Sequence, residues 1–342
     1  MEYEMPSIHA CENNACAPFL EVKDLHLCFD SLNQTTQAVR GASFSLNPGE
    51  TVALVGESGS GKSALARSLM GLNPRGSSRI ESGKIFYKGD NLLTYSEKKW
   101  RAIRGKEIAM VFQDPMAALN PTMRVGTQIE EGHRLHYPDL TRAERQKRIL
   151  SLLSDVGIRD PLLCYKQYPH ELSGGMRQRA MIATAVISSP KILLADEPTT
   201  ALDVTVQAQI LELLQHIQRE HNTTILLITH DLSIAAQFCD RILVMYGGKI
   251  VESAPKEKLF QSPKHPYTRA LLRAIPKLHV EDSAPLEPIP GSPPDLSRPL
   301  IGCSFCPRCS ERLPRCAKES PLTTLASPHH SVQCWLQGET SQ

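Results

Sequence analysis

The chain lacks any long apolar stretch. Its longest apolar runs are short, such as residues 192–195 and 224–229, whereas a helix that spans a membrane needs about 20 apolar residues in a row. Residues 1–18 contain neither a basic start nor an apolar segment, so we expect no signal peptide. Any contact with a membrane is therefore expected to go through partner proteins.

Strong net charge is also missing. The formal net charge of the 342 residues is +2, and 22% of them are charged. Proteins that bind nucleic acid usually carry a strongly basic face, so we predict no nucleic-acid partner. No internal repeat is visible, and the 41% hydrophobic content is enough for one large domain or two modest ones.

The first third of the chain predicts a buried parallel sheet. Residues 19–29 alternate between apolar and polar side chains, as in a half-buried strand, and residues 42–46 predict a second strand. The apolar run 51–55 ends in glycines and leads into a helical pattern at residues 63–70. A short apolar strand that feeds a helix in this way is typical of a parallel sheet covered on both faces.

Helical patterns then dominate residues 121–186. Within them, Thr141 and Glu144 predict a capping box at the start of a charged helix, residues 141–155. Buried strands return at residues 191–195 and 224–229, separated by a helix at residues 205–220. This alternation predicts an α/β fold with a helical insertion.

Proline becomes frequent after residue 262. Residues 281–299 are too rich in proline for regular structure and are expected to form an extended linker. A cysteine-rich tail follows this linker.

A glycine-rich loop follows the apolar run 51–55 and fits the pattern G-x-x-x-x-G-K-[ST]. Glycines allow backbone N–H groups to approach a polyphosphate closely, and the following helix points its N-terminus at the same charge. We expect Lys62 to contact the β- and γ-phosphates and Ser63 to bind Mg²⁺. The loop residues are Gly56, Glu57, Ser58, Gly59, Ser60, Gly61, Lys62 and Ser63.

Two acidic residues end the apolar strand at residues 192–195. Asp196 and Glu197 should lie at the carboxyl edge of the sheet, beside the glycine-rich loop. There Asp196 can hold Mg²⁺ through water, and Glu197 can activate the water that attacks the γ-phosphate. Alone, these acids would indicate a helix start, but beside the loop they predict a catalytic pair.

A second potential anion site lies at residues 172–176. Ser173 is a plausible N-cap, and Gly174 and Gly175 leave N–H groups uncovered. Because the chain already has one phosphate loop, we expect this surface to serve a nucleotide held by another subunit.

Together these motifs resemble those of ATP-binding-cassette ATPases, between about residues 19 and 251. The resemblance implies a phosphate-loop NTPase core with an antiparallel β subdomain and a helical subdomain. It also assigns roles to further positions: Gln113 matches the glutamine loop, Asp203 the segment that signals between subunits, and His230 the switch histidine. Phe29 falls where the family stacks an aromatic ring on adenine, and Met176 departs mildly from the usual signature.

Physical considerations agree with two of these assignments. His230 directly follows the strand 224–229 and can reach the same edge as Glu197. The Gln113 amide both donates and accepts, so it can contact Mg²⁺ or water. We therefore expect Glu197, His230, Gln113 and Lys62 to be catalytic, and Ser63, Gln113 and Asp196 to lie around Mg²⁺.

The resemblance also implies a mechanism and partners. Two cassettes would enclose two ATP molecules, each held by one phosphate loop and the other chain's signature, and closure would drive membrane subunits. The expected partners are a second, related cassette chain, two polytopic membrane permeases and an extracytoplasmic solute-binding protein. The chain would then lie peripherally on the cytoplasmic face of the membrane.

Segments outside the core refine the resemblance. Residues 199–207, 265–272 and 289–294 and the cysteine tail are similar to the peptide and nickel importer branch. We accordingly predict three parts: a flexible tail at 1–18, an ATPase domain at 19–262 with its helical subdomain at about 121–186, and a C-terminal extension at 263–342. The function implied is ATP-driven uptake of oligopeptides or dipeptides.

Ten cysteines are distributed unevenly. We interpret Cys28, Cys164 and Cys239 as buried, inert thiols. Cys11 and Cys16 lie in the polar N-terminal tail, and their positions indicate no particular role. The spacing of the tail cysteines corresponds to a four-cysteine pattern in the branch, which in some members is thought to hold a [4Fe–4S] cluster. These four residues are Cys303, Cys309, Cys316 and Cys334.

The spacing of these cysteines does not decide which metal, if any, they bind. Four thiolates suit an iron–sulfur cluster or tetrahedral zinc, and a metal-free thiol-rich tail is the third alternative. Cys306 is an additional cysteine that makes a run with Cys303 and Cys309, so the choice of ligands is open too.

Three functional alternatives remain beside peptide import. One alternative is uptake of nickel or another small solute, and a second is a soluble cassette ATPase that acts on DNA or the ribosome. Soluble cassettes usually carry two cassettes or long coiled-coil insertions, and neither is visible. A metal-binding regulatory module is disfavoured by the intact Lys62, Glu197 and His230.

Overall fold

The computed structural model describes residues 18–32, 34–200, 202–275 and 288–337. The predicted tail at 1–18 lies almost entirely outside this part of the chain, as do residues 281–287 of the predicted linker. Cys11 and Cys16 also lie outside it.

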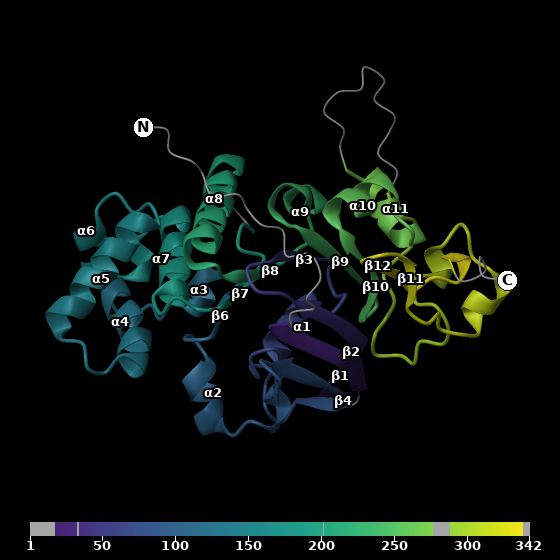
Figure 1. Cartoon of the computed structure of the whole chain (residues 1–342), viewed down its shortest axis with the longest axis horizontal. Helices are drawn as coiled ribbons and strands as arrows, with labels where there is room; N and C mark the ends of the chain where they lie inside the picture. Colours follow the sequence, from purple (N-terminus) through teal and green to yellow (C-terminus); the bar gives the residue numbers. More distant parts are fainter. Residues whose placement is uncertain (1–17, 33, 201, 276–287, 338–342) are drawn as a thin grey trace, which may run out of the picture.

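The strands of the described residues form two sheets (Figure 1). The larger sheet has the order β11-β12-β10-β9-β3-β8-β7-β6, and the smaller sheet the order β2-β1-β4-β5. The strands of the larger sheet are β3 (Thr51–Val55), β6 (Ile108–Val111), β7 (Ile192–Asp196), β8 (Thr224–Thr229), β9 (Arg241–Tyr246), β10 (Lys249–Pro255), β11 (Thr324–Ser327) and β12 (His330–Val332). Those of the smaller sheet are β1 (Leu20–Ser31), β2 (Gln34–Leu46), β4 (Ser78–Tyr87) and β5 (Asp90–Asn91).

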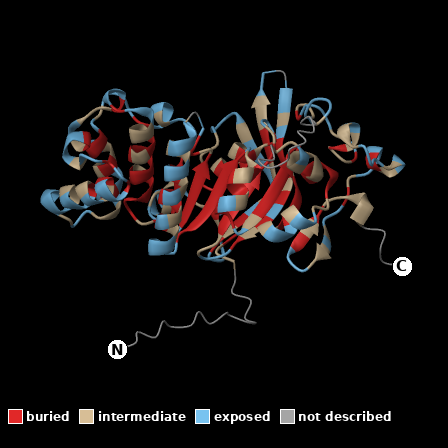
Figure 2. Ribbon diagram, turned by 90° about the horizontal axis from the view of Figure 1, so that it is seen from above, coloured by how far each residue is buried: buried red, intermediate tan, exposed pale blue. Residues whose placement is uncertain are grey.

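The larger sheet has a parallel centre. Strands β9, β3, β8, β7 and β6 pair in parallel, and every residue of β3, β7 and β8 is buried. Figure 2 shows these buried strands in the middle of the molecule, with exposed positions mainly on the surrounding helices. Continuous burial explains why these strands are apolar runs without alternation.

Helices cover the sheet and form a group at one end (Figure 1). This group contains α4, α5, α6 and α7, within the region where the sequence predicts helices. The helices are α1 (Lys62–Ser68), α2 (Glu97–Ile103), α3 (Pro115–Ala118), α4 (Val125–His136), α5 (Arg142–Asp155), α6 (Pro161–Lys166), α7 (Gly174–Val186), α8 (Val204–His221), α9 (Leu232–Phe238), α10 (Lys256–Gln261) and α11 (Pro266–Arg273). None of the helices in the described ranges is both long and apolar enough to cross a membrane.

The predicted capping box is confirmed. The Thr141 hydroxyl accepts from the Glu144 amide at 3.3 Å, and the Glu144 carboxylate accepts from the Thr141 amide at 2.8 Å. Both contacts satisfy N–H groups that have no partner inside the helix, so α5 begins where the sequence predicts.

The C-terminal segment, by which we mean the described residues after residue 262, joins the larger sheet. Strand β12 pairs antiparallel with β10, and β11 pairs with β12. On β10, beside this hairpin, the buried Glu252 carboxylate lies 2.7 Å from His330 Nε2 and accepts from the amides of Lys264 and His265. Residues 288–299 contain no helix or strand, as expected from their prolines; their role as a linker stays a prediction.

Candidate active site

Polar side chains gather at the carboxyl ends of four neighbouring parallel strands. The glycine-rich loop follows β3, Gln113 comes shortly after β6, Glu197 directly follows β7, and His230 directly follows β8. Because carboxyl ends of parallel strands share one edge, residues far apart in the sequence meet there. Asp196, the last residue of β7, lies at the same edge.

The glycine-rich loop needs glycine at two positions. A Cβ on Gly56 would lie 2.1 Å from the carbonyl oxygen of Met245, and one on Gly61 would lie 2.1 Å from that of Ala38. Gly61 also has a φ of +102°, in the left-handed region that favours glycine. Ser60 Oγ is buried without a hydrogen-bond partner among the described residues. The loop therefore contains a hydroxyl group that is available to hydrogen-bond a ligand.

Lys62 is folded back onto the loop. Its Nζ donates to the carbonyl oxygens of Gly56 at 2.7 Å and Glu57 at 2.9 Å. Burial lowers the pKa of Lys62, while the nearby carboxylates of Glu197, Asp196 and Glu57 oppose this shift. Among the described residues, no carboxylate has a recorded hydrogen bond or ion pair with this ammonium group.

Ser63 and Asp196 place two oxygen atoms side by side. Ser63 Oγ donates to Asp196 Oδ1 at 2.9 Å. Burial raises the pKa of Asp196, and the Ser63 hydrogen bond opposes this effect. Hydroxyl and carboxylate oxygens are ligands that Mg²⁺ accepts, and a cation here would relieve the cost of burying the carboxylate, so these residues fit Mg²⁺.

Glu197 is surrounded by three polar side chains. Its Oε2 accepts from Gln113 Nε2 at 3.0 Å and from Thr200 Oγ1 at 2.8 Å. Its Oε1 lies 3.3 Å from His230 Nδ1. These contacts hold the carboxylate at the sheet edge, within reach of a water molecule beside a bound phosphate.

The backbone of Glu197 is strained. Its φ is +45°, a left-handed value that is rare for a residue with a Cβ and costs about 1–3 kcal/mol. The amide of Glu197 donates to the Ile228 carbonyl at 2.9 Å, which holds the turn in place. Such strain clusters at functional sites, and here it accompanies a carboxylate that contacts both Gln113 and His230.

Four other predicted residues lie apart from this edge, at two neighbouring helix starts. Ser173 caps α7, where its hydroxyl accepts from the Met176 amide at 3.3 Å, and Gly174 and Gly175 begin that helix. Asp203 caps α8, and the Val206 side chain of that helix lies 3.1 Å from the ideal Cβ position of Gly175. Ser173, Gly174 and Asp203 are exposed, so this surface is open to a second molecule.

Phe29 is not joined to the other predicted residues by any contact that the structure records. It lies in β1 of the smaller sheet and packs, partly buried, against the core between the two sheets. Its role with adenine stays a prediction.

Sequence reasoning missed the role of several residues around the site. Thr200 contacts Glu197, and the buried Gln178 amide donates to the Pro198 carbonyl at 2.6 Å. Tyr267 and Arg308, from the C-terminal segment, both contact Glu57 of the glycine-rich loop. Thr200 and Tyr267 lie in segments used for the resemblance, whereas Arg308 had no local signal.

The three isolated cysteines are buried, as predicted. Cys28, Cys164 and Cys239 are at most 1% exposed. Burial raises the pKa of Cys28 and Cys164 to about 11 and that of Cys239 further. These thiols are therefore protonated and unreactive at neutral pH.

The tail cysteines surround one small pocket. Its walls also include His265, Glu311 and the apolar side chains of Phe305, Trp335 and Leu336. Burial raises the pKa of Cys303 to about 11 and raises the pKa values of Cys309 and Cys334. The pocket is lined by the cysteines Cys303, Cys306, Cys309, Cys316 and Cys334.

The donor chemistry of this thiol pocket fits a soft metal or an iron–sulfur cluster. The side chains are not arranged as a metal site, however, because no three His, Cys, Asp or Glu residues within the described ranges are positioned to hold an ion.

Two family models match the sequence. Residues 39–200 match the model described as "ABC transporter", and residues 251–316 match "Oligopeptide/dipeptide transporter, C-terminal region". The dipeptide transport ATP-binding protein DppD of Bacillus subtilis is 50% identical over 94% of this chain and 96% of its own length. The oligopeptide transport ATP-binding protein OppD of the same species is 47% identical over 93% of this chain and 88% of its own length.

Solved structures show the same fold. A dimeric ABC transporter cassette, MJ0796, superposes with a TM-score of 0.63 at 26% identity and covers 69% of this chain and 98% of its own. The same cassette in a post-hydrolysis state with ADP and Pi matches equally well. The cbiO1 protein of Clostridium perfringens, with a TM-score of 0.60 and 29% identity, covers 72% of this chain and 91% of its own. The chain is thus a member of the ABC transporter ATPases, in the branch that carries the oligopeptide/dipeptide transporter C-terminal region.

Proposed function

We propose that this chain hydrolyses ATP to drive the uptake of dipeptides or oligopeptides across the cytoplasmic membrane. The observation that carries the proposal is the meeting of Lys62, Asp196, Glu197 and His230 at one sheet edge, in a chain whose relatives are peptide transport ATP-binding proteins over nearly its whole length. The match of residues 251–316 to the oligopeptide/dipeptide region favours peptides over other small solutes.

The loop residues 56–63 would hold the phosphates of ATP. Lys62 would exchange its two carbonyl contacts for phosphate oxygens, and Ser60 would use its unpaired hydroxyl. Phe29 would stack on adenine. Bound Mg²⁺ would neutralise charge on the phosphates. Ser63, Asp196 and Gln113 are the residues proposed to hold it, Asp196 through water.

Glu197 is the proposed general base. Its side chain would accept a proton from the attacking water, while Gln113, Thr200 and His230 keep the carboxylate oriented. His230 is also proposed to contact the γ-phosphate, since 63% of its side chain is exposed and can turn toward a ligand.

A second cassette would complete each nucleotide site. The exposed surface at Ser173, Gly174, Gly175 and Asp203 is proposed to contact the nucleotide held by the partner. Its uncovered N–H groups at a helix start suit an anion. The further partners proposed are a related cassette chain, two membrane permeases and an extracytoplasmic solute-binding protein, with this chain on the cytoplasmic face of the membrane.

The boundaries of the three parts, at residues 18 and 262, remain part of this proposal. So does a metal in the tail, either a [4Fe–4S] cluster or zinc, held by Cys303, Cys309, Cys316 and Cys334 or with Cys306 in place of one of them. Such a group would join the turns of the tail covalently. A visible absorption spectrum and metal analysis of anaerobically purified protein distinguish cluster, zinc and neither.

Uptake in the source cell tests the function. Deleting the gene should abolish uptake of labelled dipeptides or oligopeptides, and restoring the wild-type chain, but not Lys62→Ala, should recover it. Tagged wild-type protein should co-purify with two polytopic membrane proteins and a second cassette. The proposal would be contradicted if the deletion strain took up peptides normally but had lost nickel uptake. It would also be contradicted if the tagged protein co-purified with nucleic acid alone.

A further inference from the structure

The glycine-rich loop is contacted by the C-terminal segment at one residue, Glu57. The Glu57 amide donates to Tyr267 Oη at 3.0 Å, so this N–H already has a partner. The Glu57 carboxylate accepts two hydrogen bonds from Arg308, from Nη1 at 2.7 Å and from Nη2 at 3.1 Å. This fork-shaped pair is well shielded, since 6% of the Arg308 side chain and 23% of the Glu57 side chain are exposed.

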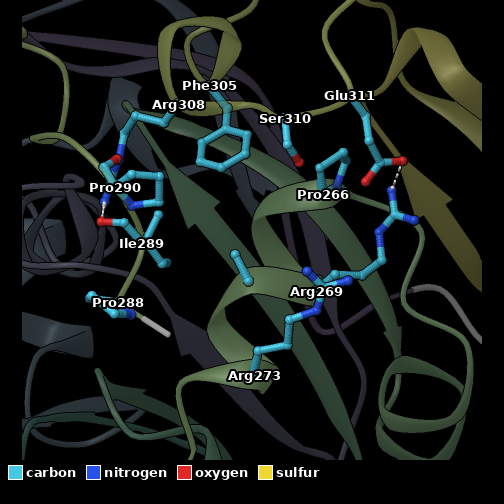
Figure 3. Close-up of a pocket in the computed structure, with 11 residues that line it drawn as sticks. Pro266, Arg269, Arg273, Pro288, Ile289, Pro290, Phe305, Arg308, Ser310 and Glu311 are labelled. Atoms are coloured by element: carbon cyan, nitrogen blue, oxygen red, sulfur yellow. Dashed lines mark hydrogen bonds and ion pairs between the residues drawn. The ribbon is translucent and has the colours of Figure 1, made fainter. Parts of the chain in front are cut away.

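Arg308 is itself held in place by several groups. Nε donates to the Pro290 carbonyl at 2.9 Å, and Nη2 donates to the Ile289 carbonyl at 3.2 Å; Figure 3 shows Arg308 beside these two residues. Nη1 also donates to Tyr246 Oη at 3.2 Å. A guanidinium fixed on several sides presents a fixed fork to a carboxylate, so Arg308 sets the position of Glu57.

The position of Glu57 matters for Lys62. The Glu57 carbonyl accepts from Lys62 Nζ at 2.9 Å, and the neighbouring Gly56 carbonyl accepts from the same atom at 2.7 Å. A shift of Glu57 therefore moves the two oxygens that hold the ammonium group in the loop. Arg308 acts on the phosphate-binding lysine through one intervening residue.

On its other side Arg308 is connected along the chain to residues that line the thiol pocket. It ends the short 3₁₀ helix η3 (Cys306–Arg308) and directly precedes Cys309. The turn is closed by backbone hydrogen bonds from Cys306 N to Cys303 O at 3.0 Å and from Cys309 N to Cys306 O at 3.3 Å. All three cysteines line the thiol pocket, so one turn connects that pocket with the glycine-rich loop.

We propose that Arg308 is a positioning residue of the nucleotide site, through which the thiol pocket and the glycine-rich loop are coupled. The inference rests on the proposed function, because it presumes that the loop binds ATP. Coupling between two sites is reciprocal. ATP binding must therefore stabilise the turn at residues 303–309 by the same factor by which that turn improves ATP binding.

Equilibrium binding of MgATP to the full-length chain tests the positioning role. In a Glu197→Gln background, which prevents turnover, Arg308→Met should raise the Kd for MgATP about tenfold, within the usual range of coupling between sites. Arg308→Lys keeps the charge but not the fork-shaped guanidinium, so its Kd for MgATP should lie between those of the parent protein and Arg308→Met. In the otherwise wild-type enzyme, Arg308→Met should raise KM for ATP by a larger factor than it lowers kcat.

A matched control and a second variant separate positioning from folding. Arg269 and Arg308 both line the pocket drawn in Figure 3. Arg269 pairs there with Glu311 at 2.9 Å and has no recorded contact to the glycine-rich loop among the described residues. Arg269→Met should therefore leave the Kd unchanged. Glu57→Gln removes the same ion pair without altering the tail and should raise the Kd like Arg308→Met, and the double variant should show no further increase.

The outcomes are distinct. If wild-type protein does not bind MgATP, the proposed function fails. If it binds MgATP and Arg308→Met and Glu57→Gln bind it equally well, the positioning role of Arg308 is wrong. Hydrogen exchange of residues 303–309 should slow when MgATP is added to wild-type protein; unchanged exchange there would overturn the coupling.

Discussion

Replacing Glu197 with glutamine tests the proposed base most directly. The carboxylate has two different oxygens: Oε2 accepts from Gln113 and Thr200, and Oε1 faces His230. A glutamine can keep its carbonyl oxygen at the Oε2 position and accept both hydrogen bonds. Its amide nitrogen then faces His230 Nδ1, which accepts a hydrogen bond when the imidazole proton is on the other ring nitrogen.

The expected loss follows from this geometry. Because shape and hydrogen bonds are retained, the substitution removes the ability to accept a proton and little else. A positioned general base contributes about 10²–10⁴-fold in rate, or about 3–5 kcal/mol of transition-state stabilisation. We expect kcat for ATP hydrolysis to fall by this factor and MgATP to remain bound.

The assay combines steady-state phosphate release at saturating MgATP with equilibrium MgATP binding. Glu212→Gln is the matched control, since Glu212 is exposed on α8, and it should hydrolyse ATP at the wild-type rate. A Glu197→Gln protein that binds MgATP and retains more than about a fifth of the wild-type kcat would refute the reasoning, because about 1 kcal/mol is too little for a general base.

Three further predictions concern Mg²⁺, a helix start and a buried thiol. Asp196→Asn should raise the Mg²⁺ concentration for half-maximal hydrolysis about 10–100-fold, as for residues that hold a metal through water; an unchanged Mg²⁺ titration would exclude that role. Thr141→Ala should lower the free energy of unfolding in urea by about 1 kcal/mol through loss of the cap, whereas Thr141→Ser should not. Burial raises the pKa of Cys164 from 9.0 to about 11, so the stability it contributes is present below pH 9 and is lost as pH rises through 11. The free energy of unfolding should therefore fall more steeply between these pH values in wild type than in Cys164→Ala, and equal slopes would count against the shift.

The sequence predicts best where a local pattern determines the structure. Residues 51–55 and 224–229 are continuous apolar runs, and both are strands with those bounds. Strand β4 has no such pattern. Gly83 bends it at a φ of +102°, where a Cβ would lie 2.5 Å from the Asp24 carbonyl oxygen, and its pairing with β1 shifts register nearby. The bend and the exposed residues around it interrupt the alternation from which a strand is recognised.

The candidate site divides in the same way. Lys62 is predicted by the glycine-rich pattern that follows one apolar strand, and Asp196 by its place at the end of another. His230 is predicted by the family resemblance, and its place directly after a third apolar strand agrees, because such strand ends meet at one edge of a parallel sheet. The contact between Arg308 and Glu57 joins residues 251 positions apart. Nothing in the sequence around Arg308 distinguishes it from a surface arginine, so only the folded structure reveals this contact.

The hairpin of β11 and β12 has a consequence for anyone who shortens this protein. A chain cut after residue 262 would expose the outer edge of β10, whose free N–H and C=O groups invite pairing with another molecule. The same cut would remove His330 and the amides of Lys264 and His265, leaving the Glu252 carboxylate on β10 without these three donors. Insolubility of such a fragment would then reflect an exposed sheet edge and a carboxylate that has lost its hydrogen-bond donors, and would reveal nothing about ATP.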